Sequence, residues 1–220
     1  MKNLIIAIDG PSGAGKGTLA RTLAARLGYR HVDTGAMYRS VAWKAAHDGL
    51  PLDDEEAVVA MAERAVLEQS GGVITIDGTD VTRAIRTPEA DKAAAAVARW
   101  PRVREVLVAR QRALGANGAV VMEGRDIGTV VFPNADMKIY LDASAEERAR
   151  RRASDSAHTG GQATLANVQS ELVARDQTDS TRAVAPLTLA ADAVYLDTTD
   201  MPLDVVVHHV LMLLTDKLQD

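Results

Sequence analysis

The sequence predicts an α/β fold in which helices pack on a parallel sheet. Short β-branched apolar runs alternate with helix-like segments at both ends of the 220-residue chain, which is the order of elements in such folds. The apolar fraction is 47%, but aromatic residues make up only 3%, so Ala, Val, Leu and Ile must form most of the core. This composition suits helices on a buried parallel sheet better than an aromatic-rich β-sandwich.

The composition also excludes several classes of protein. The chain has no cysteine, and its five histidines lack metal-ligand spacing, so we predict no metal site built from protein side chains alone. The net charge of −5 argues against a nucleic-acid partner. We find no signal-peptide pattern and no apolar run long enough for a membrane span. For this reason we expect a cytoplasmic protein. We also expect a monomer, because no extra apolar surface is obvious.

The first half of the chain contains a regular alternation and then an interruption. A turn at Asp77-Gly78 within VITIDGTDV predicts a small β-hairpin, which breaks the alternation. We interpret residues of about 60–100 as a subdomain inserted into a single domain of residues 1–220. The apolar patterns and the Gly and Pro breaks predict strands at 3–9 and 30–33, and helices at 16–27, 36–47 and 55–69.

The second half returns to the α/β pattern. Thr87-Pro88 opens one helix, and Trp100-Pro101 marks a break before the next. The remaining patterns predict strands at 119–122, 137–141 and 193–196, and helices at 102–114, 145–156, 165–176 and 203–218.

The strongest motif lies between the first predicted strand and the first predicted helix. Glycines in such a loop let successive backbone N–H groups turn toward an anion, and the helix N-terminus points at the same place. Lys16 adds a positive charge that can reach the outer phosphates of ATP. A plain Gly-rich turn is the alternative. The predicted ATP-binding residues are Gly10, Pro11, Ser12, Gly13, Ala14, Gly15, Lys16, Gly17 and Thr18.

This motif departs from the strict phosphate-loop pattern at one position. The residue after Lys16 is Gly17, and the hydroxyl comes one place later at Thr18. Direct ligation of Mg²⁺ by a loop hydroxyl is therefore left open. The ending Gly-Lys-Gly-Thr resembles that of nucleoside monophosphate kinases.

Two further polar segments follow predicted strands. One contains Asp33 and Arg39, and the other contains Glu123, Arg125 and Asp126. The carboxyl ends of parallel strands line the ligand crevice of such a sheet. Arg39 can offer a bidentate fork to a phosphate, whereas Asp33 could equally be a helix N-cap.

Together, five segments make the resemblance specific. GPSGAGKGT, DTGAMYR, RVRE, GRDIGTVVFP and RAVAPL occur in an order and spacing that resembles bacterial cytidylate kinases. The resemblance covers essentially the whole chain, including the hairpin insertion. It implies a three-layer P-loop fold with a small inserted monophosphate-binding subdomain and a helical lid. It also implies ATP-dependent phosphorylation of CMP and dCMP with Mg²⁺.

The resemblance also implies an acceptor site. It places Thr34 and Asp126 on the amino side of cytosine and Arg104 and Arg182 on its acceptor atoms. It further implies that Arg39 and Arg125 hold the acceptor phosphate. It also implies that Arg175 and Asp179 bind the sugar. Ala95 stands where some relatives have a serine near the base, which leaves the fine base and sugar preference open.

Arginines near the end of the chain predict a lid. Arg148, Arg151 and Arg152 share one helical face by their spacing, and Arg175, Asp179 and Arg182 repeat this arrangement if their helix runs far enough. We therefore expect residues of about 148–182 to close over the phosphates, although solvated surface helices are the alternative. The predicted catalytic residues are Lys16, Arg39, Arg125, Arg148 and Arg152.

Other functions remain as alternatives to a CMP kinase. The chain could phosphorylate another small acceptor, such as UMP, AMP or shikimate, because the phosphate loop alone does not select the acceptor. It could also be a regulator that binds ATP without turnover, although the arginine set has no obvious use there. An RNA-contacting protein is a third alternative, but the basic segments are short and the net charge opposes it.

Overall fold

The structure is a computed structural model that describes residues 2–155 and 164–219. The chain divides into two compact units. Within the described residues, the first unit comprises 2–33, 112–154 and 164–219, and the second comprises 34–111 with residue 155. Each unit is described by itself below.

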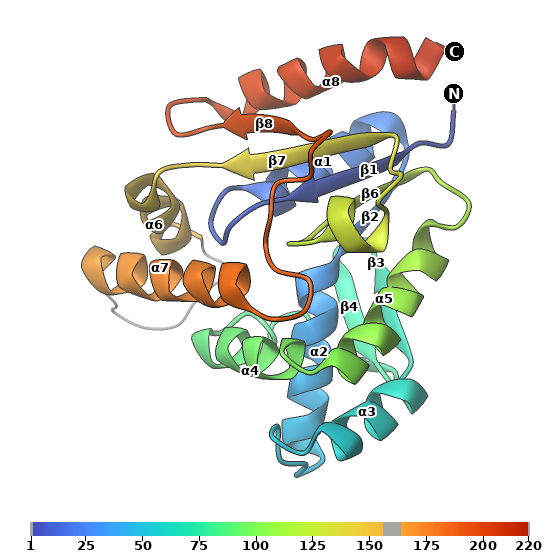
Figure 1. The fold of residues 1–220 in the computed structure, drawn as a ribbon, viewed down its shortest axis with the longest axis vertical. Coiled ribbons are helices and arrows are strands. Elements are labelled where there is room, and N and C mark those ends of the chain that lie inside the picture. Colours follow the sequence, from blue (N-terminus) through green and yellow to red (C-terminus); the bar gives the residue numbers. More distant parts are fainter. Residues whose placement is uncertain (1, 156–163, 220) are drawn as a thin grey trace. The chain divides into compact units, whose positions relative to one another are not determined.

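The first unit contains a five-stranded sheet in the order β2-β6-β1-β7-β8 (Figure 1). All neighbouring strands are parallel, with Ile6 of the central strand opposite Val121 on one side and Met137 on the other. The phosphate-loop strand therefore lies in the middle of the sheet. The strands are β1 (Ile5–Asp9), β2 (Arg30–Asp33), β6 (Val120–Glu123), β7 (Met137–Asp142) and β8 (Val194–Asp197).

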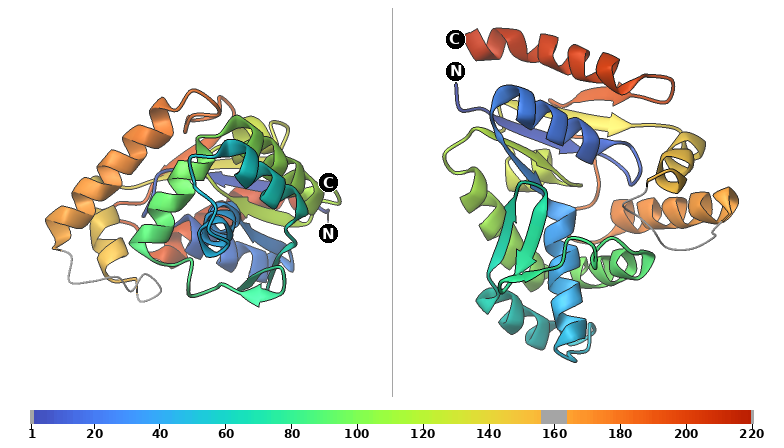
Figure 2. Two further views of the ribbon diagram at one scale, coloured as in Figure 1. Left: turned by 90° about the horizontal axis from the view of Figure 1, so that it is seen from below. Right: turned by 180° about the vertical axis from the view of Figure 1, so that it is seen from behind.

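Two helices cover one face of this sheet. Apolar side chains of α1 (Lys16–Leu27) and α8 (Leu203–Gln219) pack into one core cluster with those of β1 and β7. The π-helical turn η1 (Ile127–Val131) lies against β1 on the other face (Figures 1 and 2). The sheet is thus buried by helical structure on both sides, as a parallel sheet requires.

Two more helices of the first unit pack on each other (Figure 1). They are α6 (Ala145–Ala153) and α7 (Leu165–Thr181). Ser144 and Thr164 cap their N-termini by accepting hydrogen bonds from backbone N–H groups. Helix α7 runs beyond the predicted end at residue 176, so it carries Arg175 and Asp179 on one element and places Arg182 at its C-cap.

The second unit contains helices and a small antiparallel sheet. Its strands β3 (Leu67–Ser70), β4 (Val73–Ile76) and β5 (Thr79–Asp80) pair in that order, so the predicted hairpin is confirmed and has one additional strand. Helices α2 and α4 pack closely. The helices are α2 (Thr34–His47), α3 (Glu55–Arg64), α4 (Pro88–Ala98) and α5 (Pro101–Gly115), of which the last four residues belong to the first unit.

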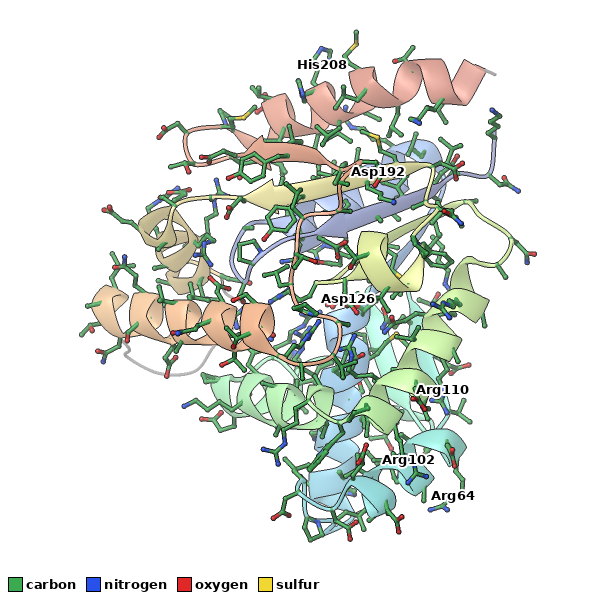
Figure 3. The ribbon with its side chains drawn as sticks, viewed as in Figure 1. Arg64, Arg102, Arg110, Asp126, Asp192 and His208 are labelled. Carbon is green, nitrogen blue, oxygen red and sulfur yellow. The ribbon has the colours of Figure 1, made fainter. Side chains whose placement is uncertain are left out.

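The predicted helix over residues 55–69 is wrong in its last third. Helix α3 ends at Arg64, and residues 67–70 form β3 instead. Arg110 of α5 donates to the carbonyls of Ala62 and Glu63 and so satisfies the end of α3, while the Val66 N–H donates to Asp77 at 2.7 Å (Figure 3). Both partners are distant in sequence, so the local pattern did not reveal this helix end.

The α/β fold with a parallel sheet behind a phosphate loop is confirmed. Other element boundaries differ by a few residues, as with α2, which begins at Thr34 rather than 36. The inserted subdomain at 60–100 and the lid at 148–182 stay predictions. Residues 156–163 of the predicted lid lie outside the described residues.

Candidate active site

The phosphate loop joins the central strand β1 to helix α1. Gly10, Gly13 and Gly15 have φ values of 143°, 81° and 94°, which side chains other than glycine rarely adopt. A Cβ atom at Gly10 would lie 2.0 Å from the Leu141 carbonyl oxygen. The loop therefore depends on glycine both for its backbone conformation and for its close contact with β7.

Lys16 begins helix α1 and is buried, with only 6% of its surface exposed. Its Nζ donates to the Pro11 carbonyl oxygen at 2.6 Å, which folds the side chain back over the loop. The pKa of Lys16 is lowered to about 7, mainly by burial and to a smaller extent by the positive charge of the nearby Arg125. A bound phosphate would supply the negative charge that favours the protonated amine.

Gly17, the departure from the strict motif, lies against a carboxylate. A Cβ atom there would lie 3.0 Å from Oε1 of Glu123, the last residue of β6. The Glu123 carboxylate also lies 2.9 Å from Nε2 of His31 on the neighbouring strand β2. The first turn of α1 thus faces a carboxylate where other phosphate loops have a hydroxyl.

Asp9 ties the phosphate-loop strand to the segment after β6. It ends β1 and is 5% exposed. Its two oxygens accept hydrogen bonds from the backbone N–H groups of Ile127 and Gly128 at 2.8 and 2.7 Å. Burial raises the pKa of Asp9 to about 6, although these two hydrogen bonds oppose the rise. The segment that contains Arg125 and Asp126 is therefore held directly beside the loop.

Two arginines of α6 contact the backbone of the phosphate loop. Arg148, which is buried, donates to the Ser12 carbonyl oxygen at 3.1 Å and to that of Ala143 at 3.0 Å. Arg151 donates to the Ala14 carbonyl oxygen at 3.1 Å and to the hydroxyl and carbonyl of Thr198. The predicted arginine face of α6 thus meets the loop through Arg148 and Arg151.

Five of the predicted acceptor residues form a charged cluster within the first unit. Asp179 Oδ2 accepts from Arg125 Nε at 2.9 Å. Arg182 Nη2 lies 3.7 Å from Asp126 Oδ1, and its Nη1 lies 3.9 Å from Asp179 Oδ1. Burial raises the pKa of Asp179, but Arg125 and then Arg175 outweigh it and hold the pKa below its usual value. Asp126, labelled in Figure 3, is the N-cap of η1.

The remaining predicted acceptor residues lie at the end of β2 or in the second unit. Asp33 ends β2, and Thr34, which is buried, begins α2. Arg39 of α2 is 7% exposed, and its Nη1 lies 3.6 Å from Asp91 Oδ1 on α4. The Arg104 guanidinium lies over the Tyr38 ring, 5.7 Å from its centroid. Both arginines are therefore held in place before any ligand binds.

Comparison with known proteins identifies the family of the chain. A sequence model of the family described as "Cytidylate kinase" matches residues 6–216. The chain belongs to the cytidylate kinase family. The chain is 49% identical over 221 residues to the cytidylate kinase of Desulfitobacterium hafniense (strain Y51), with 99% of this chain and 95% of that one covered. It is 45% identical over 220 residues to the cytidylate kinase of Geobacillus sp. (strain WCH70), with 98% of each covered.

Solved structures of other small kinases share the fold. A shikimate kinase from Acinetobacter baumannii in complex with shikimate superposes with a TM-score of 0.51 at 16% identity, covering 98% of this chain and 95% of that one. A gluconokinase from Sinorhizobium meliloti 1021 gives 0.50 at 17% identity, with 99% and 96% covered. These likenesses support the fold alone, since the identity is low.

Several residues of the site are not marked by the sequence pattern. Arg151 contacts the phosphate loop as Arg148 does, but its spacing predicts only that it lies on the arginine face of α6. Asp9, His31 and Asp176 are not among the predicted site residues. Asp9 precedes the loop directly and could have been suspected from that position. The partners of the other two are 92 and 164 residues away in sequence, so no local pattern marks them.

Within residues 2–155 and 164–219, no group of three or more His, Asp or Glu side chains could hold a metal ion. The described helices include none that is long and apolar enough to cross a membrane.

Proposed function

We propose that this chain catalyses the phosphorylation of CMP and dCMP by ATP, which gives ADP and the corresponding diphosphate, as part of pyrimidine nucleotide metabolism. The observation that carries the proposal is the Asp126–Arg182 pair, 3.7 Å apart, in the unit that holds the phosphate loop. A carboxylate beside a guanidinium offers an acceptor and donors on one edge, as cytosine requires. Membership of the cytidylate kinase family supports the same reaction.

ATP would bind through the loop of residues 10–18. Backbone N–H groups of the loop and the N-terminus of α1 attract its phosphates, and Lys16, Arg148 and Arg152 add positive charge. Mg²⁺ would be held mainly by phosphate oxygens of ATP. When bound, Mg²⁺ supplies charge neutralisation on the outer phosphates of ATP.

The acceptor would be recognised by the residues that the family resemblance implies. Asp126 and Thr34 would accept from the amino group of cytosine, while Arg182 and Arg104 would donate to ring N3 and carbonyl O2. Arg39 and Arg125 would bind the phosphate, and Arg175 and Asp179 the sugar. Uracil reverses the donor and the acceptor at this edge, so UMP would leave buried polar groups unsatisfied.

The reaction needs no catalytic base. An oxygen of the CMP phosphate, already largely dianionic near neutral pH, attacks the γ-phosphorus of ATP. The bond from that phosphorus to the β–γ bridging oxygen breaks, and its electron pair leaves with ADP. Lys16 and the arginines hold the two phosphates in line and stabilise the charge that develops.

The test is Mg²⁺-dependent ADP release from ATP with CMP, dCMP, UMP and AMP at matched concentrations. Strong turnover with CMP and dCMP and little with UMP supports the proposal. Preference for UMP or AMP overturns the acceptor assignment but leaves the phosphate-loop assignment intact. ADP release that does not depend on a monophosphate, or no release with any of the four, overturns the kinase assignment.

A further inference from the structure

A carboxylate of helix α7 occupies donors of the phosphate loop. Asp176 Oδ1 accepts a hydrogen bond from the Ser12 backbone N–H at 3.3 Å. Its Oδ2 accepts one from Arg148 Nη1. The carboxylate is 20% exposed and the Arg148 side chain 9%. An anion is thus already bound where a loop amide and a buried guanidinium converge.

Arg148 does not need this carboxylate to keep its place. Its Nε donates to the Ala143 carbonyl oxygen at 3.0 Å and its Nη1 to that of Ser12 at 3.1 Å. The Ala143 carbonyl directly follows β7, and Ser12 belongs to the phosphate loop, so both acceptors are backbone groups that remain when Asp176 moves. If Asp176 moves away, Arg148 stays directed at the loop with a donor available to another anion.

We propose that Asp176 is an internal anion that competes with the phosphates of ATP and so sets the affinity of the phosphate loop for nucleotide. The proposal rests on the proposed function, since it takes the loop to be the ATP site. A carboxylate and a phosphate oxygen require the same two donors, and their negative charges repel at short distance.

The displacement has a consequence for the acceptor cluster. Helix α7 also carries Asp179, which accepts from Arg125 Nε at 2.9 Å. Asp176 and Asp179 are one turn apart on this helix, so release of Asp176 removes an ion pair that holds α7 to α6, next to the pair between Asp179 and Arg125. Nucleotide binding would therefore affect the acceptor cluster, because Asp179 of that cluster lies on the same helix as Asp176.

The test is ATP binding to the full chain by isothermal titration calorimetry, for the unaltered chain and the Asp176→Asn variant. The amide keeps the shape and an acceptor oxygen but removes the charge, so we expect Kd for ATP to fall about tenfold, or about 1.4 kcal/mol. Asp176→Glu keeps the charge and should bind ATP within about threefold of the unaltered chain. Glu105→Gln removes an exposed charge from the second unit and should change Kd less than twofold.

The direction of the effect separates this role from a structural one. Damage to the fold weakens binding, so tighter binding by a variant of unchanged or lower melting temperature supports competition. Unchanged or weaker ATP binding by Asp176→Asn overturns the inference. ATP binding by Asp176→Glu that is as tight as that by Asp176→Asn overturns it too. If Asp176→Asn does not fold, Asp176→Ala gives the same comparison.

The experiment also distinguishes this inference from the proposed function. ATP binding is measured without CMP, so tighter binding by Asp176→Asn supports the inference even if the chain fails to phosphorylate CMP. Conversely, CMP turnover by the unaltered chain together with unchanged ATP affinity in Asp176→Asn leaves the proposed function intact and overturns the inference.

Discussion

The arginines of α6 at the phosphate loop and the second-unit arginines assigned to the acceptor are held in different ways. In the first unit, Arg148 and Arg151 donate to backbone carbonyls of the phosphate loop and of neighbouring strand ends. In the second unit, Arg39 lies beside the carboxylate of Asp91, and Arg104 lies over the ring of Tyr38. Carbonyl partners remain when a side chain is replaced, whereas side-chain partners do not.

This difference predicts which substitutions should affect ATP and which should affect the acceptor. The donor side of the reaction depends on backbone geometry, so its arginines keep their orientation through most single substitutions. The acceptor side depends on pairs of side chains, each of which can be removed. The following predictions test this contrast in order of decreasing effect.

The largest effect is expected for Lys16→Met. It removes a buried charge from the loop without changing the glycine conformations, so we expect kcat to fall by about 10²–10³-fold. The measurement is steady-state ADP release with CMP, with circular dichroism to verify folding. The exposed Lys217→Met is the control and should retain full activity. A loss of less than tenfold in Lys16→Met would contradict the role of Lys16.

Arg182→Ala should act on the acceptor and not on ATP. The arginine lies beside Asp126 and Asp179, and its loss removes the predicted donors to N3 and O2 of cytosine. We expect kcat/KM for CMP to fall about 100-fold, or about 2.7 kcal/mol, while KM for ATP changes less than threefold. An equal loss for both substrates would refute the assignment of Arg182 to the base.

The affinity for ATP should depend on pH through Lys16. Because its pKa is lowered to about 7 by burial, most of the free protein carries a neutral Lys16 at pH 8, and anion binding must take up a proton. Affinity should therefore weaken by up to about tenfold per pH unit above pH 7. Calorimetry at pH 8 in buffers of different ionisation enthalpy should give about 0.9 protons taken up per ATP bound.

Lys16→Arg provides the control for this linkage. Arginine stays charged at every pH used, so proton uptake in this variant reports only the nucleotide itself. The difference in proton uptake between the two proteins therefore measures the protonation of Lys16. Equal uptake by both would show that Lys16 is already protonated in the free protein.

The smallest effect is expected for Asp91→Asn in the second unit. Arg39 loses the carboxylate at 3.6 Å but keeps its own charge, so we expect KM for CMP to rise about fivefold to tenfold with kcat within twofold. The matched change Asp80→Asn, at an exposed position of the same unit, should leave KM unchanged. A fall in kcat without a change in KM would mean that Asp91 does not act by positioning Arg39 for the acceptor.

The sequence alone predicted the parts of the molecule that depend on local rules. The glycines at 10, 13 and 15 mark the phosphate loop because few other residues adopt their conformations. The apolar positions Leu19, Leu23 and Leu27 predicted the buried face of α1. Asp126 and Arg182 were grouped through resemblance to a family, and the structure places them 3.7 Å apart.

What the sequence did not predict depends on distant partners. Helix α3 ends where Arg110, more than 40 residues away, satisfies its carbonyls. The π-helical turn η1 begins beside two amides held by Asp9, which is 118 residues from Ile127. Asp176 became a candidate only through its contact with Ser12. Each of these contacts is created by the folded chain and leaves no mark on the local pattern.

The hydrogen bonds of Asp9 also limit how this enzyme could be recombined. One carboxylate at the end of β1 holds the amides of Ile127 and Gly128, next to the residues assigned to the acceptor. Because these donors are backbone N–H groups, a chimera that grafts the 124–131 loop of a kinase with another acceptor keeps both hydrogen bonds only if the loop length is unchanged and an acid remains at residue 9. Within those two conditions, we expect acceptor choice to be exchangeable without any change to the phosphate loop.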